Sequence, residues 1–189
     1  MRIIAGDWRG RRLAAVGRGD AGAHLRPTTD RVREALFNML AGGRFGDPFE
    51  GARVLDLFAG TGALGLEALS RGATSCSFVD RGRVALRLLR QNVELLGCAD
   101  RARVLGCDAT RLPPAEAPCA LVFLDPPYGA GLGETALSGA QAQGWLAPGA
   151  LIVWEESAPQ PAPPGFDAVE TRRYGDTHVT LLRASGGAT

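Results

Sequence analysis

The residues with the clearest chemical potential form the run Asp125-Pro126-Pro127-Tyr128, which follows an apolar stretch at 121–124. Two prolines cannot continue a central strand, so they predict a rigid, extended turn with fixed carbonyl groups. An aromatic amine is a weak nucleophile because its lone pair is delocalised into the ring. The Asp125 carboxylate and the Pro126 carbonyl can each accept one N–H of such an amine, while Tyr128 stacks on the ring. The run predicts a site for the exocyclic amine of a nucleic-acid base.

A second chemical element lies at 54–65, where an apolar run leads into Gly60-x-Gly62-x-x-Gly65. Glycines at this spacing allow a tight turn and close approach of the backbone to a nucleotide at a helix N-terminus. Nicotinamide and flavin enzymes use the same device. The spacing therefore predicts a nucleotide-containing cofactor without choosing among them.

Acidic residues accompany three successive apolar runs. Asp56 lies beside the glycine loop, and Asp80 stands where a carboxylate can accept both hydroxyls of a ribose. Asp108 can meet an adenine amine, or it can cap the segment that follows. Arg81 would suit a 2′-phosphate, which keeps an NADP alternative open. A pocket lined by acids nevertheless favours S-adenosylmethionine, whose sulfonium and ammonium are positive, over a pyrophosphate cofactor.

These patterns together indicate methyl transfer to a base amine, since a hydride-transfer enzyme has no use for the proline-containing run. The predicted catalytic residues are Asp125, Pro126, Pro127 and Tyr128. The predicted S-adenosylmethionine-binding residues are Asp56, Phe58, Ala59, Gly60, Thr61, Gly62, Asp80, Arg81, Asp108 and Ala109. No metal ion is predicted, because the cysteines and histidines do not stand at metal-ligand spacing.

An alternation of apolar strands and helices must position these groups. Strands are expected at 53–58, 75–79, 102–107, 120–124 and 150–155, and helices at 63–70, 83–96 and 133–143. This order predicts an α/β fold with a parallel, Rossmann-like sheet covered on both faces, whose strand carboxyl ends form one ligand-binding edge. A proline-rich stretch precedes two more strands, 166–174 and 177–183, which predict an antiparallel hairpin.

The N-terminal region is locally basic, although the net charge of the chain is only +1. Residues 2–16 predict a short hairpin with a basic tip. Beyond Pro27, Thr28 or Thr29 can cap a helix. We expect Val32, Leu36, Met39 and Leu40 to form the buried face of this helix.

Two interpretations of this basic region are open. Scattered arginines usually form a solvated surface, but Trp8 among arginines favours phosphate contacts plus a stacking platform for RNA. The predicted RNA-binding residues are Arg2, Trp8, Arg9, Arg11, Arg12, Arg26 and Arg31.

Composition excludes several classes of protein. A chain of 189 residues suits one main domain, and 46% hydrophobic with 22% charged residues is typical of a globular protein. No apolar run reaches membrane-spanning length and no secretory segment is recognisable, so we expect a cytoplasmic protein. The four cysteines are expected to be buried, reduced thiols.

The chain resembles the D-type family of bacterial 16S rRNA guanine-N2 methyltransferases, which modify the small ribosomal subunit. The resemblance runs through 2–6, 8–11, 25–28, 30–34, 36–38, 54–65, 66–73 and 125–128. It implies a seven-stranded methyltransferase fold and methylation of one guanine in 16S rRNA, within an assembling or assembled 30S subunit. It also implies that residues 1–45 form an RNA-binding extension and 46–189 the catalytic domain.

Alternatives remain open from the sequence. Asp-Pro-Pro-Tyr serves an N6-adenine methyltransferase equally well, although no target-recognition domain for DNA is evident. A nicotinamide-dependent oxidoreductase and a non-catalytic RNA-binding assembly factor are the alternatives from other classes.

Overall fold

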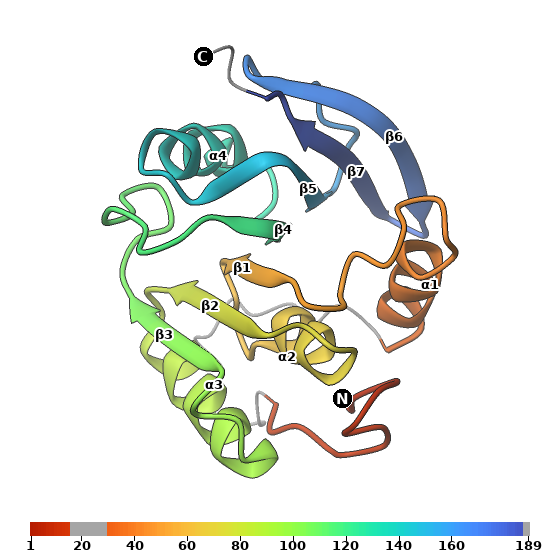
Figure 1. The fold of residues 1–189 in the computed structure, drawn as a ribbon, viewed down its shortest axis with the longest axis vertical. Helices are drawn as coiled ribbons and strands as arrows, with labels where there is room; N and C mark the ends of the chain where they lie inside the picture. The colour runs from red at the N-terminus through yellow and green to blue at the C-terminus, as the bar shows by residue number, and fades with distance from the viewer. Residues whose placement is uncertain (16–29, 187–189) are drawn as a thin grey trace.

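The computed structural model describes residues 1–15 and 30–186, which form one seven-stranded sheet with the order β3-β2-β1-β4-β5-β7-β6 (Figure 1). The strands are β1 (Arg53–Leu57), β2 (Ser75–Asp80), β3 (Ala102–Gly106), β4 (Cys119–Leu124), β5 (Leu146–Glu156), β6 (Phe166–Tyr174) and β7 (Thr177–Ala184). β1 to β5 pair in parallel, whereas β7 pairs antiparallel with both β5 and β6. The predicted α/β class and the C-terminal hairpin are confirmed.

Four helices cover the two faces of this sheet: α1 (Asp30–Leu40), α2 (Ala63–Ser70), α3 (Arg83–Leu96) and α4 (Leu132–Ala142). Alternate residues of a strand point to opposite faces. Val54 of β1 accordingly joins a core cluster with α1, α2 and α3, whereas Leu55 joins a second cluster with α4. The strand order reverses between β1 and β4, and this is where open α/β sheets bind ligands.

The buried face of α1 differs from the expected one. Leu36 and Leu40 are buried as predicted, but Val32 and Met39 are only half-buried, and Arg33 and Phe37 are buried in their place. Phe37 stacks on Phe49 with ring centres 5.5 Å apart. Arg33 Nη2 donates to the Arg2 carbonyl and to Asp30, which offsets part of the cost of burying this guanidinium. The predicted cap of this helix lies outside the described residues.

The N-terminal arm, residues 1–15, is a small hairpin held by a bridge between Arg2 and Arg12. Inside it, the Ile3 amide donates to the Arg11 carbonyl at 2.9 Å, and the Gly10 amide donates to the Ile3 carbonyl at 2.9 Å. The side chains of Ile3 and Leu13 are buried in the same cluster as α1, α2 and α3. The expected hairpin therefore exists and shares the core of the sheet.

Two smaller expectations have definite outcomes. The fifth strand begins at Leu146, four residues before the expected 150, because a register irregularity lets Leu146 pair with Cys119. All four cysteines are free; Cys76, Cys98 and Cys119 are buried and Cys107 is half-buried. Across residues 1–15 and 30–186, no helix is long and apolar enough to cross a membrane.

Candidate active site

The glycine loop joins β1 to α2 at the carboxyl edge of the sheet. Among the described residues, Phe58 is the only non-glycine residue with a positive φ, which is 59°. A strained backbone conformation of this kind is typical of functional turns. Gly62 has φ 80°, and a Cβ there would lie 2.4 Å from Leu89 Cδ1. A Cβ at Gly65 would lie 2.4 Å from Phe78 Cε1. Gly62 therefore allows close packing of the loop against α3, and Gly65 allows close packing of α2 on β2.

Asp56, which we predicted to contact the cofactor, is buried beneath this loop. Its exposed fraction is 1%, and its Oδ2 accepts the Gly65 amide at 2.9 Å. Burial, together with the charge of Asp80, raises the pKa of Asp56 to about 7. In this structure Asp56 holds the first turn of α2 in place.

Replacing Asp56 with asparagine should stabilise the protein more at about pH 8 than at about pH 4. The folded-state pKa of about 7 lies above the ordinary value of 3.8, so the folded protein keeps a proton that the unfolded chain releases between these values. The stabilisation that this proton gives the wild-type protein is complete below pH 3.8 and is lost as the pH rises through 7. Each pKa unit corresponds to about 1.4 kcal/mol. The measurement is Tm of both proteins across this pH range, and a constant difference would contradict the assignment.

Asp80 lies at the end of β2 and is bonded directly to the glycine loop. Its Oδ2 accepts the Gly60 amide at 2.8 Å, and its Oδ1 accepts the Gly82 amide at 2.7 Å. Each carboxylate oxygen has a further lone pair, so a ribose hydroxyl can still be accepted. The acid predicted to bind ribose and the loop predicted to approach the cofactor are thus one hydrogen-bonded unit.

Asp108 and Arg81 form an ion pair at the ends of β3 and β2, with 2.7 Å between Arg81 Nη1 and Asp108 Oδ2. Asp108 Oδ1 also accepts the Thr110 amide at 2.9 Å and the Thr110 hydroxyl at 2.7 Å. These hydrogen bonds, and secondarily Arg81, lower the pKa of Asp108. Asp108 therefore both caps its own turn and faces the cation that would attract a 2′-phosphate. Ala109 beside it is buried.

Asp125 is the first residue after β4, and it lies at the carboxyl edge of the sheet beside the end of β1. Its amide donates to the Leu57 carbonyl at 3.4 Å. Leu124 pairs with Trp154 in a parallel register, so Asp125 and Glu155 stand beside each other at the ends of β4 and β5. Burial, followed by the charges of Glu155, Asp56 and Glu156, raises the pKa of Asp125 well above its usual range.

The turn that follows Asp125 is fastened to β5 and β7. The Tyr128 hydroxyl donates to Glu155 Oε1 at 3.3 Å and lies 3.2 Å from Thr177 Oγ1. Burial raises the pKa of Tyr128 to about 12, so the hydroxyl keeps its proton. The Gly129 amide donates to Glu156 Oε1 at 3.2 Å. Pro126 is buried and Pro127 is exposed. These hydrogen bonds hold the hydroxyl end of the Tyr128 side chain beside β5 and β7.

Sequence reasoning missed Glu155, Glu156 and Thr177. The two glutamates are 3% and 6% exposed, which is unusual for carboxylates that end an apolar strand. Two acids directly after an apolar run were a signal that could have found them, by the same logic that found Asp80 and Asp108. Thr177 gave no local signal, since it is brought to Tyr128 only by the antiparallel pairing of β7 with β5.

The arginines of the N-terminal arm lie on its surface. Arg2, Arg9, Arg11 and Arg12 are exposed, as is Arg31 in the first turn of α1. Arg26 lies outside the described residues. The Arg11 guanidinium donates to the Leu95 carbonyl of α3, so Arg11 also anchors the arm.

Trp8, which we predicted to form a stacking platform for RNA, lies between the arm and the body of the protein. It is half-buried and packs against the core, with the Arg101 guanidinium 5.0 Å from its ring centre. Such a cation–π contact occupies one side of the ring. In this structure Trp8 helps to hold the arm to β3.

Residues of α2 hold the arm to the rest of the fold. Glu67 accepts the Ile4 amide at 2.8 Å and the Ala5 amide at 3.0 Å. The Ser70 hydroxyl donates to the Ala5 carbonyl at 2.6 Å and accepts the Trp8 amide at 3.0 Å. Because α2 begins at the glycine loop, this one helix connects the arm to that loop.

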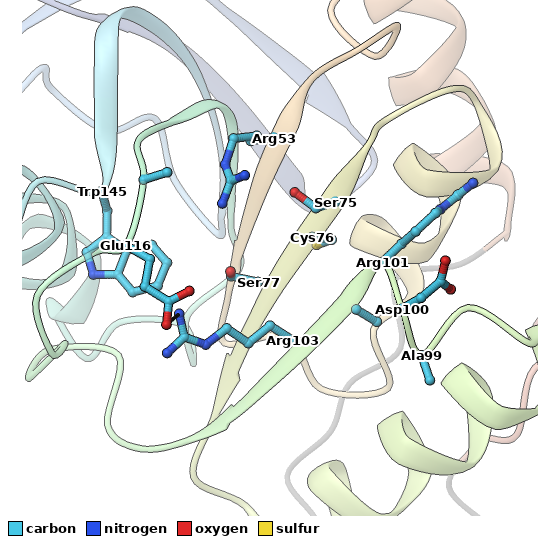
Figure 2. Close-up of a pocket in the computed structure, with 12 residues that line it drawn as sticks. Arg53, Ser75, Cys76, Ser77, Ala99, Asp100, Arg101, Arg103, Glu116 and Trp145 are labelled. Carbon is cyan, nitrogen blue, oxygen red and sulfur yellow. Dashed lines mark ion pairs between the residues drawn. The ribbon is translucent and has the colours of Figure 1, made fainter.

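A hollow of about 310 Å³ lies at the opposite edge of the sheet, beside the first residues of β1, β2 and β3. Figure 2 shows Arg103 and Glu116 pointing toward each other there, and their charged groups are 2.8 Å apart. The hollow contains none of the predicted site residues. Ligands of open α/β sheets bind at the carboxyl ends of the strands, so we place the reaction at the Asp125 edge instead.

The fold and this edge define the chain as a Rossmann-like methyltransferase. It belongs to the family described as "Conserved hypothetical protein 95", whose model matches residues 1–183. The resemblance noted from the sequence is thereby confirmed.

Three similar proteins support this membership. The Ribosomal RNA small subunit methyltransferase D of Escherichia coli K12 is 44% identical over 156 residues, covering 82% of this chain and 74% of the relative. The Putative rRNA methyltransferase YlbH of Bacillus subtilis is 39% identical over 193 residues, covering 98% and 100%. The solved structure "Putative methyltransferase yhhF from Escherichia coli" has a TM-score of 0.80 at 37% identity, covering 98% of each chain.

Proposed function

We propose that the chain transfers a methyl group from S-adenosylmethionine to the exocyclic N2 amine of one guanine in 16S rRNA, within the 30S subunit in the cytoplasm. The observation that carries this proposal is the position of Asp125-Pro126-Pro127-Tyr128. This run lies at the carboxyl end of β4, beside the glycine loop, and is fastened by Glu155 and Glu156. The family resemblance supports guanine as the base, and the names of the relatives support rRNA as the substrate.

The cofactor-binding edge fits S-adenosylmethionine in its donor and acceptor groups. Asp80 and Asp108 offer carboxylate oxygens for ribose hydroxyls and an adenine amine, and both acids suit a positively charged cofactor. The proposed binding residues are Phe58, Ala59, Gly60, Thr61, Gly62, Asp80, Arg81, Asp108 and Ala109, with Asp56 supporting the loop from below. When bound, S-adenosylmethionine supplies an electrophilic methyl group.

The residues of the turn orient and activate the amine. The Asp125 carboxylate and the Pro126 carbonyl each accept one N–H, which raises electron density on the nitrogen. Tyr128, fixed by Glu155 and Thr177, stacks on the base, a contact worth about 1 to 3 kcal/mol in comparable sites. Pro127 keeps the turn extended. Positioning and electrostatics supply the rate enhancement, and the amine proton passes to water after transfer.

We assign residues 1–45 as an RNA-binding extension and 46–189 as the catalytic domain. Exposed arginines of the arm supply phosphate contacts, which position RNA without reading its sequence. The proposed RNA-binding set also includes Arg31 of α1, which is exposed, and Arg26.

The proposal is tested by incubating the protein with methyl-labelled S-adenosylmethionine and three acceptors. These are 30S subunits that lack the modification, naked 16S rRNA and duplex DNA. We expect labelling of the ribosomal acceptors and none of the DNA. Labelling of the DNA alone would overturn the assigned substrate.

A further inference from the structure

Asn92 of α3 lies where the N-terminal arm, α3 and the glycine loop meet, and it is completely buried. Its Oδ1 accepts the Ala14 amide at 2.7 Å. Its Nδ2 donates to the Ala14 carbonyl at 3.1 Å and to the Thr61 carbonyl at 2.9 Å. A single side chain therefore holds the arm on one side and the cofactor-binding loop on the other.

The hydrogen bonds of this amide leave little room for substitution. A primary amide has two N–H donors, and at Asn92 one is given to the arm and the other to the loop. Leu89, Val93 and Leu96 are its buried neighbours on α3, so a leucine at position 92 would suit the packing better. Leucine would leave the backbone groups of Ala14 and Thr61 without a partner, which costs free energy when they are buried. The amide therefore contributes polar connections rather than apolar packing.

Thr61 is the residue whose orientation matters most here. It stands between Gly60, with φ 56°, and Gly62, with φ 80°, so its carbonyl belongs to the tightest part of the loop. Glycines give that loop conformational freedom, which an external hydrogen bond can limit. Displacement of Ala14 would strain or break the bond from Asn92 to Thr61.

We propose that Asn92 is a positioning residue that couples RNA binding by the arm to cofactor binding by the glycine loop. This inference rests on the proposed function, which assigns RNA to the arm and S-adenosylmethionine to the loop. Contact of RNA with the arm fixes Ala14, and Asn92 then fixes the Thr61 carbonyl in the conformation that receives the cofactor. Coupling of this kind is reciprocal, so the cofactor also tightens RNA binding.

Ser70 provides a matched control because it anchors the same arm elsewhere. Its hydroxyl bonds the backbone of Ala5 and Trp8, both of which belong to the arm itself. Removing the Ser70 hydroxyl should loosen the arm without breaking the link from Asn92 to the loop. Loss of arm stability and loss of coupling can therefore be separated.

The test measures the Kd of S-adenosylhomocysteine by calorimetry, with and without saturating unmodified 16S rRNA. In the wild-type protein we expect RNA to lower this Kd at least about fivefold. In Asn92→Leu the ratio should fall to about one, whereas Ser70→Ala should weaken RNA binding and keep the wild-type ratio. Thermal unfolding checks that each variant is folded. If Asn92→Leu does not fold, Asn92→Asp replaces it, since aspartate keeps the shape and removes both donors.

The inference would be overturned by a wild-type protein that binds both ligands without coupling, or by a folded Asn92 variant that keeps the wild-type ratio. Equal loss of the ratio in Ser70→Ala would also contradict it, because any loosening of the arm would then be sufficient. A wild-type protein that binds no RNA would overturn the proposed function as well. Failure of the coupling alone leaves the methyltransferase assignment intact.

Discussion

Replacing Asp125 with alanine should slow methyl transfer in a single turnover by roughly 100- to 1,000-fold, the usual cost of removing a catalytic hydrogen-bonding group. The affinity for S-adenosylmethionine should stay nearly unchanged, because the groups assigned to the cofactor lie at the carboxyl ends of β1, β2 and β3 and not of β4. The measurement pairs rapid-quench kinetics with calorimetry on the same preparation. Equal losses of rate and cofactor affinity would show that Asp125 supports the cofactor instead of the amine.

Asp125→Asn is the matched control for this prediction. Asparagine keeps one oxygen that can accept an amine N–H, so its rate should lie between those of the wild type and Asp125→Ala. The pKa of Asp125 is raised well above its usual range by burial and neighbouring acids, and the reaction needs the carboxylate. The wild-type rate should therefore rise with pH beyond the range of an ordinary carboxyl group. Asp125→Asn should lose that rise, and an identical pH profile would contradict the assigned role.

Replacing Arg9 and Arg12 together with glutamine should weaken RNA binding and reduce its salt dependence. Both side chains are exposed on the arm. Each lost phosphate contact lowers the slope of log Kd against log salt by about one unit, so the double variant should lose about two. The measurement is fluorescence anisotropy of a labelled 16S rRNA fragment at several salt concentrations.

Arg183→Gln is the control for the arm variant, since it removes the same type of charge from β7. The Arg183 guanidinium donates to the Gly149 carbonyl, on the side of the sheet away from the arm. It should leave the slope unchanged. Arg11 is kept in both proteins because its bond to the Leu95 carbonyl anchors the arm. An unchanged slope in the Arg9 and Arg12 variant would show that these arginines make no phosphate contacts and that the arm is structural.

Most of the sheet could be predicted from the sequence because its strands are continuous apolar runs. The runs near Val54, Phe78 and Phe123 alternate with helical segments, and this pattern has few other solutions. The acids at the strand ends followed from the same logic, since parallel strands deliver their carboxyl ends to one edge. Local periodicity was therefore sufficient for the architecture and for placing the Asp125 turn at the carboxyl end of β4.

Contacts between distant residues could not be predicted in this way. The sequence suggests that Arg33 lies on a polar surface, yet it is buried and donates to the Arg2 carbonyl and to Asp30. Asp56 reads as a cofactor ligand, but its partner is the Gly65 amide, which only the packing of α2 brings close. The sequence suggests an exposed Trp8, but the Arg101 guanidinium packs against its ring. In each case the deciding partner comes from another element of the fold.

The same reason explains why the glutamates behind Tyr128 were missed. Glu155 and Glu156 end a strand that looks like any other apolar run. The two acids after this run were a signal, but the parallel pairing of β4 and β5 is what shows that they lie beside Asp125. The sequence suggested the residues proposed to face the substrate, and the fold shows which residues contact them.

The measurement that tests the central claim most directly is the identity of the methylated nucleoside. Unmodified 16S rRNA is incubated with the protein and deuterated-methyl S-adenosylmethionine, digested to nucleosides and examined by mass spectrometry. The proposed function predicts the label on the exocyclic N2 of guanosine, and labelling by Asp125→Ala should be slower by roughly 100- to 1,000-fold. Label on the N6 of adenosine would contradict the assigned base, and label on a ring carbon or a ribose would contradict amine methylation itself.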